Sequence, residues 1–312
     1  MRELRDNGVA VFIVTHRIAE LVRISDKATV MRDGKDVGIL EKKDLNEKNL
    51  IGLMTGRAET GEKSKSTALQ TKTDKIVMRA ENLVVWPESK PVNFEVKRGE
   101  IIGVTGLDGN GQDDFVKILA GVQEAHGGTT EILDINENFT KYNSLESAKQ
   151  NGISFVSGDR KKEGILPNLS IYENLVVPLY KKTSRAGFLG FIDWLELNGI
   201  FDWEVDRLSI KTGPRDNLIG SLSGGNQQKV MIARSFAQHP KVLILNDPAR
   251  GIDVSTKRDL YVHLRKYVEE GNTVVFLSSE LEEFIGLCPK VMVFRNGTIF
   301  DIFENDKINA DT

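Results

Sequence analysis

Cysteine and histidine, the residues that form disulfide bonds and zinc sites, are scarce in this sequence. Its single cysteine, Cys288, excludes an internal disulfide and is typical of a protein from a reducing compartment. The four histidines are scattered, so no zinc cluster is predicted; they are His16, His126, His239 and His263. Lys+Arg 42 nearly balance Asp+Glu 45, which leaves a formal charge of −3. This balance argues against binding of nucleic acid through bulk electrostatics, so no nucleic-acid partner is predicted.

Long hydrophobic runs are missing as well. A transmembrane helix needs about 20 mostly apolar residues, whereas runs such as residues 242–245 end after a few positions. Residues 187–197 are more apolar, but Asp193 and Glu196 interrupt them. The first residues, MRELRDNG, lack the apolar segment of a signal peptide. We therefore expect a cytoplasmic protein whose membrane contacts are made through a partner.

The sequence does contain an internal repeat. Residues 8–34 align without a gap on residues 271–297, and each copy reads glycine, apolar run, helical stretch, second apolar run and Arg-x-Gly. Each copy therefore predicts a strand, a helix, a second strand and a turn. The first runs, 9–14 and 273–277, have the continuous apolar character of strands buried in a parallel sheet. Asp33-Gly34 and Asn296-Gly297 are hairpin-turn signals.

The repeat also suggests the domain organisation. The second copy ends a long domain, whereas the first has little chain before it and cannot bury enough surface alone. We interpret residues 1–57 as the C-terminal remnant of a domain whose body is missing. Residues 58–74 are rich in Ser, Thr, Lys and Glu and are predicted to be a linker, the alternative being a solvated loop. A second domain is predicted over 75–306, with a tail at 307–312.

Within the second domain, strand and helix patterns alternate. Strands are expected at 101–105, 152–156, 242–245 and 273–277, and helices at 114–119, 226–237 and 254–270. Such alternation predicts an α/β fold with a mostly parallel sheet covered on both faces.

A glycine-rich turn follows the first of these strands. Residues 103–121 read GVTGLDGNGQDDFVKILAG, the context of a phosphate-binding loop, in which backbone N–H groups and a helix N-terminus surround phosphates. Gln112 stands where Lys is required, and Asp113 stands where Ser or Thr is required. The loop thus keeps the shape and loses the positive charge, so strong ATP binding here is not expected. The candidate nucleotide-binding residues of the loop are Gly106, Gly109, Asn110, Gly111, Gln112 and Asp113.

A second candidate anion site lies at residues 221–229, SLSGGNQQK. Ser223, Gly224 and Gly225 come just before a predicted helix, so a hydroxyl and free backbone N–H groups face outward at its positive end. Ser-Gly-Gly alone is also a common helix cap. The longer motif, followed by Ala-Arg and a buried strand, is much more specific.

These motifs resemble a known family. LSGGNQQK resembles the signature motif of ABC-transporter ATPases, and VLILNDPARGID at 242–253 resembles their Walker B strand and D-loop. VFIVTH, in the first repeat copy, resembles their switch-histidine strand. RGIDV and SGDRKKEG, at 157–164, are similar to the ribose/galactose/xylose class of sugar importers, in which two ATPase domains lie in tandem.

The resemblance implies a P-loop NTPase fold, with a RecA-like core and a helical subdomain at about 159–220. It also implies head-to-tail domain pairs, in which each ATP site uses the phosphate loop of one domain and the signature of the other. Roles are then assigned by position. His16 would contact the γ-phosphate, Asp247 would take the place of the carboxylate that polarises the attacking water, and Asn246 would mark the Mg²⁺ position. The signature contacts to ATP would come from Ser223, Gly224, Gly225 and Gln227, and the domain interface from Arg250, Gly251 and Asp253. Trp86 is a candidate base-stacking residue, with simple packing an equal alternative.

Four departures from the family pattern affect the second domain's own site. Besides Gln112, the family's Asp-Glu pair is replaced by Asn246-Asp247, its switch histidine by Ser279, and its Gln or Glu by Gly158. Neutral Asn is a poorer Mg²⁺ ligand, and the shorter Asp would position water badly. The changes reflect either independent drift or a site that has become structural.

The sequence thus predicts the ATP-binding and ATP-hydrolysing component of a bacterial sugar importer, peripheral on the inner face of the membrane, with ATP and Mg²⁺ as cofactors. Expected partners are transmembrane permease subunits, a periplasmic or lipid-anchored sugar-binding protein reached through them, and another ABC ATPase domain. Residues 187–194 are a candidate permease contact or ordinary core. The alternative function is a degenerate half-domain with a structural or regulatory role, inactive alone. A soluble ABC protein of translation or DNA repair is disfavoured, because no basic or coiled-coil insertion is visible.

Overall fold

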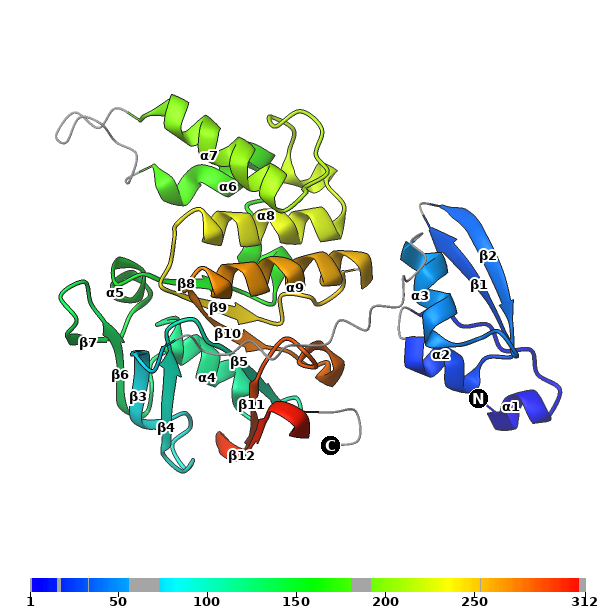
Figure 1. The fold of residues 1–312 in the computed structure, drawn as a ribbon, viewed down its shortest axis with the longest axis horizontal. Helices are drawn as coiled ribbons and strands as arrows, with labels where there is room; N and C mark the ends of the chain where they lie inside the picture. The colour runs from blue at the N-terminus through cyan, green and yellow to red at the C-terminus, as the bar shows by residue number, and fades with distance from the viewer. Residues whose placement is uncertain are drawn as a thin grey trace. The chain divides into compact units, whose positions relative to one another are not determined.

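A computed structural model of the chain describes residues 2–308 except 16–17, 33, 56–72, 181–191 and 253. The described residues form two compact units (Figure 1): a small unit up to residue 55, and a large unit that contains most of the chain from residue 73 onward. None of the described helices is long and apolar enough to span a membrane.

The small unit is a hairpin covered by helices. Its elements are α1 (Arg2–Asp6), α2 (Ile18–Ile24), β1 (Lys27–Arg32), β2 (Lys35–Glu41) and α3 (Glu47–Thr55). β1 and β2 pair antiparallel. Its small core consists of Ala28, Val30, Leu45 and Leu50, with α2 residues such as Leu21 packed against it.

The hairpin part of the repeat is confirmed. β11 (Lys290–Arg295) and β12 (Thr298–Glu304) form the second hairpin. Its turn residues Asn296 and Gly297 have φ of 53° and 72°, as a tight two-residue turn requires. Both hairpins have a bulge at the equivalent position, directly after Val30 and directly after Val293. The two copies differ before the hairpin: α2 is an α-helix, whereas the second copy has only the short 3₁₀ turn η5 (Leu281–Glu283).

The predicted buried strand at residues 9–14 is wrong. These residues are not in a strand, and the side chains of Phe12 and Val14 are 92% and 87% exposed. The equivalent run in the second copy, β10 (Thr273–Leu277), lies between two parallel strands that satisfy its backbone groups, and all its residues are buried. In the described part of the small unit only β1 and β2 form a sheet, and they pair with each other, which leaves 9–14 without such neighbours.

The large unit is built on the predicted sheet. Its six strands run in the order β12-β11-β5-β10-β9-β8. The strands not yet located are β5 (Ile101–Gly106), β8 (Ile153–Val156) and β9 (Val242–Asn246). Pairing is parallel from β8 to β11, and only β12 is antiparallel. The four strands expected from apolar runs are therefore confirmed, and every residue of β9 and β10 is buried.

The second sheet of the large unit is not predicted by the apolar runs of the sequence. It is antiparallel, ordered β4-β3-β6-β7, and consists of β3 (Ile76–Val84), β4 (Val92–Lys97), β6 (Gly127–Leu133) and β7 (Phe139–Tyr142). Helix α4 (Gln112–Leu119) packs between the two sheets. Its Phe115 contacts Phe94 of β4 and Phe294 of β11, with ring centroids 5.5 and 4.7 Å away.

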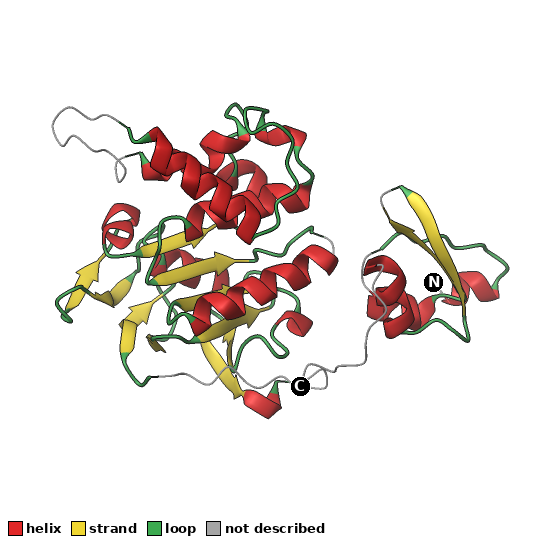
Figure 2. Cartoon of the chain, turned by 45° about the horizontal axis from the view of Figure 1, so that its top comes forward, coloured by secondary structure: helices red, strands yellow, loops and turns green. Residues whose placement is uncertain are grey.

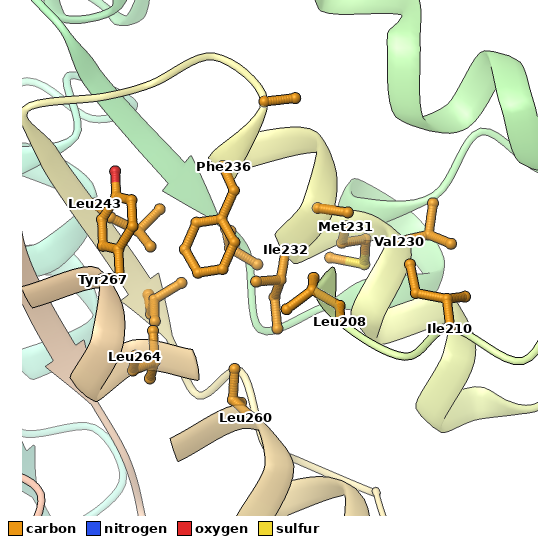
Figure 3. Packing of buried hydrophobic residues seen from close by; sticks show 14 of the residues in the cluster. Leu208, Ile210, Val230, Met231, Ile232, Phe236, Leu243, Leu260, Leu264 and Tyr267 are labelled. Carbon is orange, nitrogen blue, oxygen red and sulfur yellow. The ribbon is translucent and has the colours of Figure 1, made fainter. Parts of the chain in front are cut away.

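Helices cover the other face of the six-stranded sheet. α8 (Gly224–Phe236) and α9 (Val254–Glu269) lie next to it, and α6 (Ile171–Val176) and α7 (Trp194–Arg207) lie beyond α8 (Figures 1 and 2). Figure 3 shows the packing of this layer, where Phe236 of α8 stacks on Tyr267 of α9 at 4.6 Å between centroids. The shorter elements are α5 (Leu145–Gln150), η1 (Arg160–Gly164), η2 (Val177–Leu179), η4 (Ile219–Ser221) and η6 (Asn305–Lys307).

Candidate functional site

The phosphate loop, residues 106–112, joins β5 to α4 and has the expected glycine geometry. Gly109 and Gly111 have φ of 77° and 93°, and Gly111 is the N-cap of α4. A Cβ on Gly111 would lie 2.7 Å from the Cα of Gly297, so only glycine fits there. Asn110 fastens the loop to the β11–β12 turn, because its carbonyl and its side-chain oxygen accept from the amides of Gly297 and Asn296. The loop shape is therefore maintained by contacts within the protein.

Gln112 fills the space inside this loop. The residue is 7% exposed, and its Nε2 donates to the carbonyl oxygens of Gly106 at 3.2 Å and Leu107 at 3.0 Å. A neutral amide that is bonded to loop carbonyls supplies neither charge nor a free donor to a phosphate. The predicted loss of positive charge is thus accompanied by a side chain that holds the loop to itself.

Asp113 contacts the end of β9. Asn246 Nδ2 donates to Asp113 Oδ1 at 2.6 Å, and Lys117 Nζ lies 2.6 Å from Asp113 Oδ2. The hydrogen bond to Asp113 is the main reason why the pKa of Lys117 is raised. These residues do not fit the Mg²⁺ predicted at Asn246, since a metal ion on Asp113 would have to displace an amide or an ammonium group. Among the described residues, no group of three or more His, Cys, Asp or Glu could hold a metal.

The other departures from the family pattern also contact their neighbours. Ser279 Oγ donates to Asp247 Oδ2 at 3.3 Å. A Cβ on Gly158 would lie only 2.9 Å from the carbonyl oxygen of Asn246, so the glutamine of the family pattern would not fit without a shift. Ser279 and Gly158 therefore lie beside the Asn246-Asp247 pair at the carboxyl end of β9.

Trp86 lies against the phosphate loop. Its Nε1 donates to Asp114 Oδ2 at 2.8 Å, and a Cβ on Gly111 would lie 3.2 Å from the indole ring. The ring is half-buried. These contacts are those of a packing residue, and base stacking stays a prediction.

The signature lies at the start of a different helix. Ser223 is the N-cap of α8, is exposed, and accepts the backbone N–H of Asn226 at 3.4 Å. Gly224 and Gly225 are half-buried in the first turn. Gln227 Nε2 donates to the carbonyl of Leu222 at 3.0 Å and thus stabilises the turn before the helix. Predicted to begin at 226, the helix begins at Gly224.

Arg160, which supports this turn, is not among the site residues predicted from the sequence. Arg160, in η1, donates from Nη1 to the carbonyl of Gly224 at 3.0 Å. In the opposite direction Arg234, near the end of α8, donates to the carbonyl of Gly164 at the end of η1. Two arginines therefore attach η1 to α8. Arg160 is part of the motif SGDRKKEG, so the motif marks the structural role of this arginine as well as the family resemblance.

The remaining predicted residues are only partly covered by the structure. His16 and Asp253 lie outside the described residues. Arg250 and Gly251 are exposed, directly after the buried Ala249. Of the apolar stretch 187–194, residues 187–191 also lie outside, while Trp194 and the following Leu195 are 54% and 81% exposed.

Comparison with known proteins agrees with this fold. The ABC transporter family model matches residues 89–250. The chain is 31% identical over 312 residues to the ribose import ATP-binding protein RbsA of Clostridium perfringens (strain SM101 / Type A), covering 100% of this chain and 61% of that protein. It is 30% identical over 313 residues to the galactose/methyl galactoside import ATP-binding protein MglA of Mannheimia succiniciproducens, covering 60% of that protein.

The chain thus spans about 60% of the length of these relatives. Among solved structures, the ATP-binding cassette MJ0796 bound to ADP and Pi superposes with a TM-score of 0.62 at 22% identity, covering 73% of this chain and 98% of that one. This likeness supports the cassette fold of the large unit.

Proposed function

The chain belongs to the ABC transporter family of ATP-binding proteins, and from this premise we propose that it acts in a sugar importer and contributes the signature of a composite ATP site. The intact start of α8 carries the proposal. Ser223 presents its hydroxyl at the surface, and Gly224 and Gly225 place backbone N–H groups at the positive helix end. The phosphate loop of the same unit is, in contrast, bonded to itself through Gln112.

In this proposal, ATP and Mg²⁺ are held by the phosphate loop of another ABC ATPase domain. Ser223 and the first N–H groups of α8 then donate to γ-phosphate oxygens and stabilise the charge that develops on them during hydrolysis. His16 and Asp253 would complete such a site, as the family pattern implies. Arg250 and Gly251, exposed after the buried Ala249, would contact the other domain.

The transport partners follow from the same family membership. We propose permease subunits as the membrane partner, with the exposed Trp194 and Leu195 on α7 as part of the contact surface. A sugar-binding protein would be reached through the permease, and the chain would lie at the cytoplasmic face. Sugar as the transported class is supported by the names of the relatives, which import ribose or galactose.

A second candidate is a structural or regulatory half-domain that is inactive alone. It is favoured by the paired state of the large unit's own site, in which Asn246 bonds to Asp113 and Ser279 bonds to Asp247. Both candidates predict very slow ATP hydrolysis by this chain alone, since each missing transition-state contact costs about 10²-fold or more in rate.

The two candidate functions are distinguished by adding a separate ABC ATPase domain that has an intact phosphate loop. If the signature works, Mg-ATP turnover appears in the mixture and falls by about 10²-fold in Ser223→Ala and in Gly225→Asp. Ser144→Ala is the matched control, because Ser144 also caps a helix, α5, but lies far from the signature in sequence. Turnover that is equal in the wild type and Gly225→Asp would support the structural role instead.

A further inference from the structure

Two departures from the family pattern meet in one contact. Asp113 is in the first turn of α4, and Asn246 is the last residue of β9. In phosphate-loop ATPases these positions carry a hydroxyl and a carboxylate that hold a metal ion between them. Here the carboxylate is on the helix and an amide is on the strand, and the two bond directly at 2.6 Å. The two substitutions are therefore complementary rather than independent losses.

Lys117 completes the contact from one turn further along α4. Its ammonium lies 2.6 Å from Asp113 Oδ2, the oxygen that Asn246 does not use. Glu163 and Asp114 also lie close enough to favour the charged form of this lysine. Asp113 thus has a cationic partner on its own helix and a neutral donor on the strand.

The strand side of this contact is buried, whereas the side chain of Asp113 is half-exposed. Asn246 is 5% exposed. Gly158 lies directly against it, because a Cβ on Gly158 would be 2.9 Å from the Asn246 carbonyl oxygen and 3.3 Å from Oδ1. Gln112, the neighbour of Asp113, is bonded inside the loop.

We propose that Lys117, Asp113 and Asn246 form a bridge that joins α4 to β9 in place of a divalent cation and keeps the large unit's phosphate loop closed without metal or nucleotide. The inference rests on the proposed function only in taking the loop as the non-working half of the pair of sites. It assigns to Asp113 and Asn246 a joint role that neither residue has in the family pattern.

The test is to convert the bridge back into a metal site. Asn246→Asp places two carboxylates within hydrogen-bond distance, which is unfavourable unless a cation or a proton lies between them. We expect this variant to melt at a lower temperature than the wild type in the presence of a chelator. It should regain stability with millimolar Mg²⁺ or Mn²⁺, and bind Mn²⁺ at least about tenfold more tightly than the wild type.

The reversed pair is the matched control. Asp113→Asn combined with Asn246→Asp keeps one amide and one carboxylate, so it should be more stable than Asn246→Asp alone in chelator and respond less to Mn²⁺. Asp113→Asn alone tests the wild-type contact without adding charge, and should lower the melting temperature without creating metal binding.

Two results would overturn the proposal. One is saturable Mn²⁺ binding by the wild type that disappears in Asp113→Asn, which would make Asp113 a metal ligand. The other is an Asn246→Asp variant as stable as the wild type in chelator, which would show that the contact does not hold α4 to β9. Neither result depends on ATP turnover. The proposed bridge can therefore be refuted without refuting the proposed function of the signature motif, and the reverse also holds.

Discussion

Arg160 donates a hydrogen bond from Nη1 to the carbonyl oxygen of Gly224 at 3.0 Å, and so attaches the turn after β8 to the first residue of the signature helix. The preceding Gly158 lies against Asn246 at the end of β9. The segment from Gly158 to Arg160 thus connects the carboxyl end of β9 to the signature helix.

We predict that Arg160 and Gly224 are energetically coupled. A Cβ on Gly224 would lie 3.0 Å from Arg160 Nη2. Gly224→Ala should therefore destabilise the wild type by about 1 kcal/mol, yet be neutral or stabilising in Arg160→Ala, where the space is free. Urea unfolding of the four proteins in this double-mutant cycle measures the coupling. Equal effects of Gly224→Ala in both backgrounds would contradict it. Lys161→Ala, at the exposed neighbouring residue, is the control and should change little.

Glu204 should make stability depend on pH. It lies on α7, is 1% exposed, and its Oε1 lies 3.3 Å from Arg207 Nη1. Burial raises the pKa of its carboxyl to about 7, with Arg207 opposing and Glu270 adding to the rise. The folded state thus binds this proton more tightly than the unfolded chain. The resulting stability is present below the ordinary pKa of 4.5 and is lost as the pH rises through about 7.

Glu204→Gln keeps the shape of the side chain and removes the titration. Between about pH 5 and about pH 8 the wild type should lose roughly 1–3 kcal/mol of unfolding free energy that the variant retains. Denaturant titrations at several pH values measure this difference. Parallel pH profiles for the two proteins would show that Glu204 is already ionised at pH 5.

Gly158 should not tolerate a side chain. Gly158→Ala brings a Cβ to 2.9 Å from the Asn246 carbonyl oxygen, and we expect a loss of about 1–3 kcal/mol in unfolding free energy. Gly199 is the matched control, because it lies in α7 and a Cβ there meets no atom within 4 Å. Gly199→Ala should be stabilising by about 0.5–1 kcal/mol, as expected for glycine to alanine inside a helix. Thermal melts of both variants measure these changes. A Gly158→Ala variant as stable as the wild type would refute the close contact between position 158 and the Asn246 carbonyl oxygen.

The layer of α8 and α9 should depend on Phe236. Its side chain is fully buried and stacks on Tyr267 (Figure 3). The guanidinium carbon of Arg207 lies 4.5 Å from the centre of its ring. Phe236→Ala should cost about 3–5 kcal/mol, from lost burial and the cavity that remains. Phe300, which is 62% exposed, gives the control Phe300→Ala, with an expected change below about 0.5 kcal/mol. Equal urea midpoints for the two variants would contradict this packing.

Backbone amides at residues 11–14 should exchange rapidly with solvent. These residues are not in a strand, and Phe12 is 92% exposed. Their repeat counterpart β10 lies in the centre of the sheet and should be among the slowest to exchange. Hydrogen–deuterium exchange with peptide resolution compares the two directly. Strong protection of 11–14 would mean that this segment pairs with another strand.

Much of the large unit could be predicted from local pattern. The runs Val242–Asn246 and Thr273–Leu277 are apolar except for one end residue each and are buried throughout, as strands covered on both faces are. The four-stranded sheet escaped prediction because its strands are partly exposed and irregular; β3, for example, includes polar residues at Arg79, Glu81 and Asn82 and two register shifts. At residues 9–14 the apolar pattern gave a wrong prediction, since a strand also requires neighbouring strands to pair with.

The sequence by itself determined the glycine turn, the signature cap and the buried strands, because each depends on backbone preference or side-chain polarity within a few consecutive residues. Only the tertiary structure decided that Asp113 and Asn246 bond to each other. They are separated by 133 residues. Asp113 lies on α4, which follows β5, and Asn246 ends β9; β5 and β9 are not neighbours, since β10 lies between them. The sheet order and the packing of α4 bring the carboxylate of Asp113 to the amide of Asn246. Each residue alone departs from the family pattern, but in the folded protein the two form a hydrogen bond.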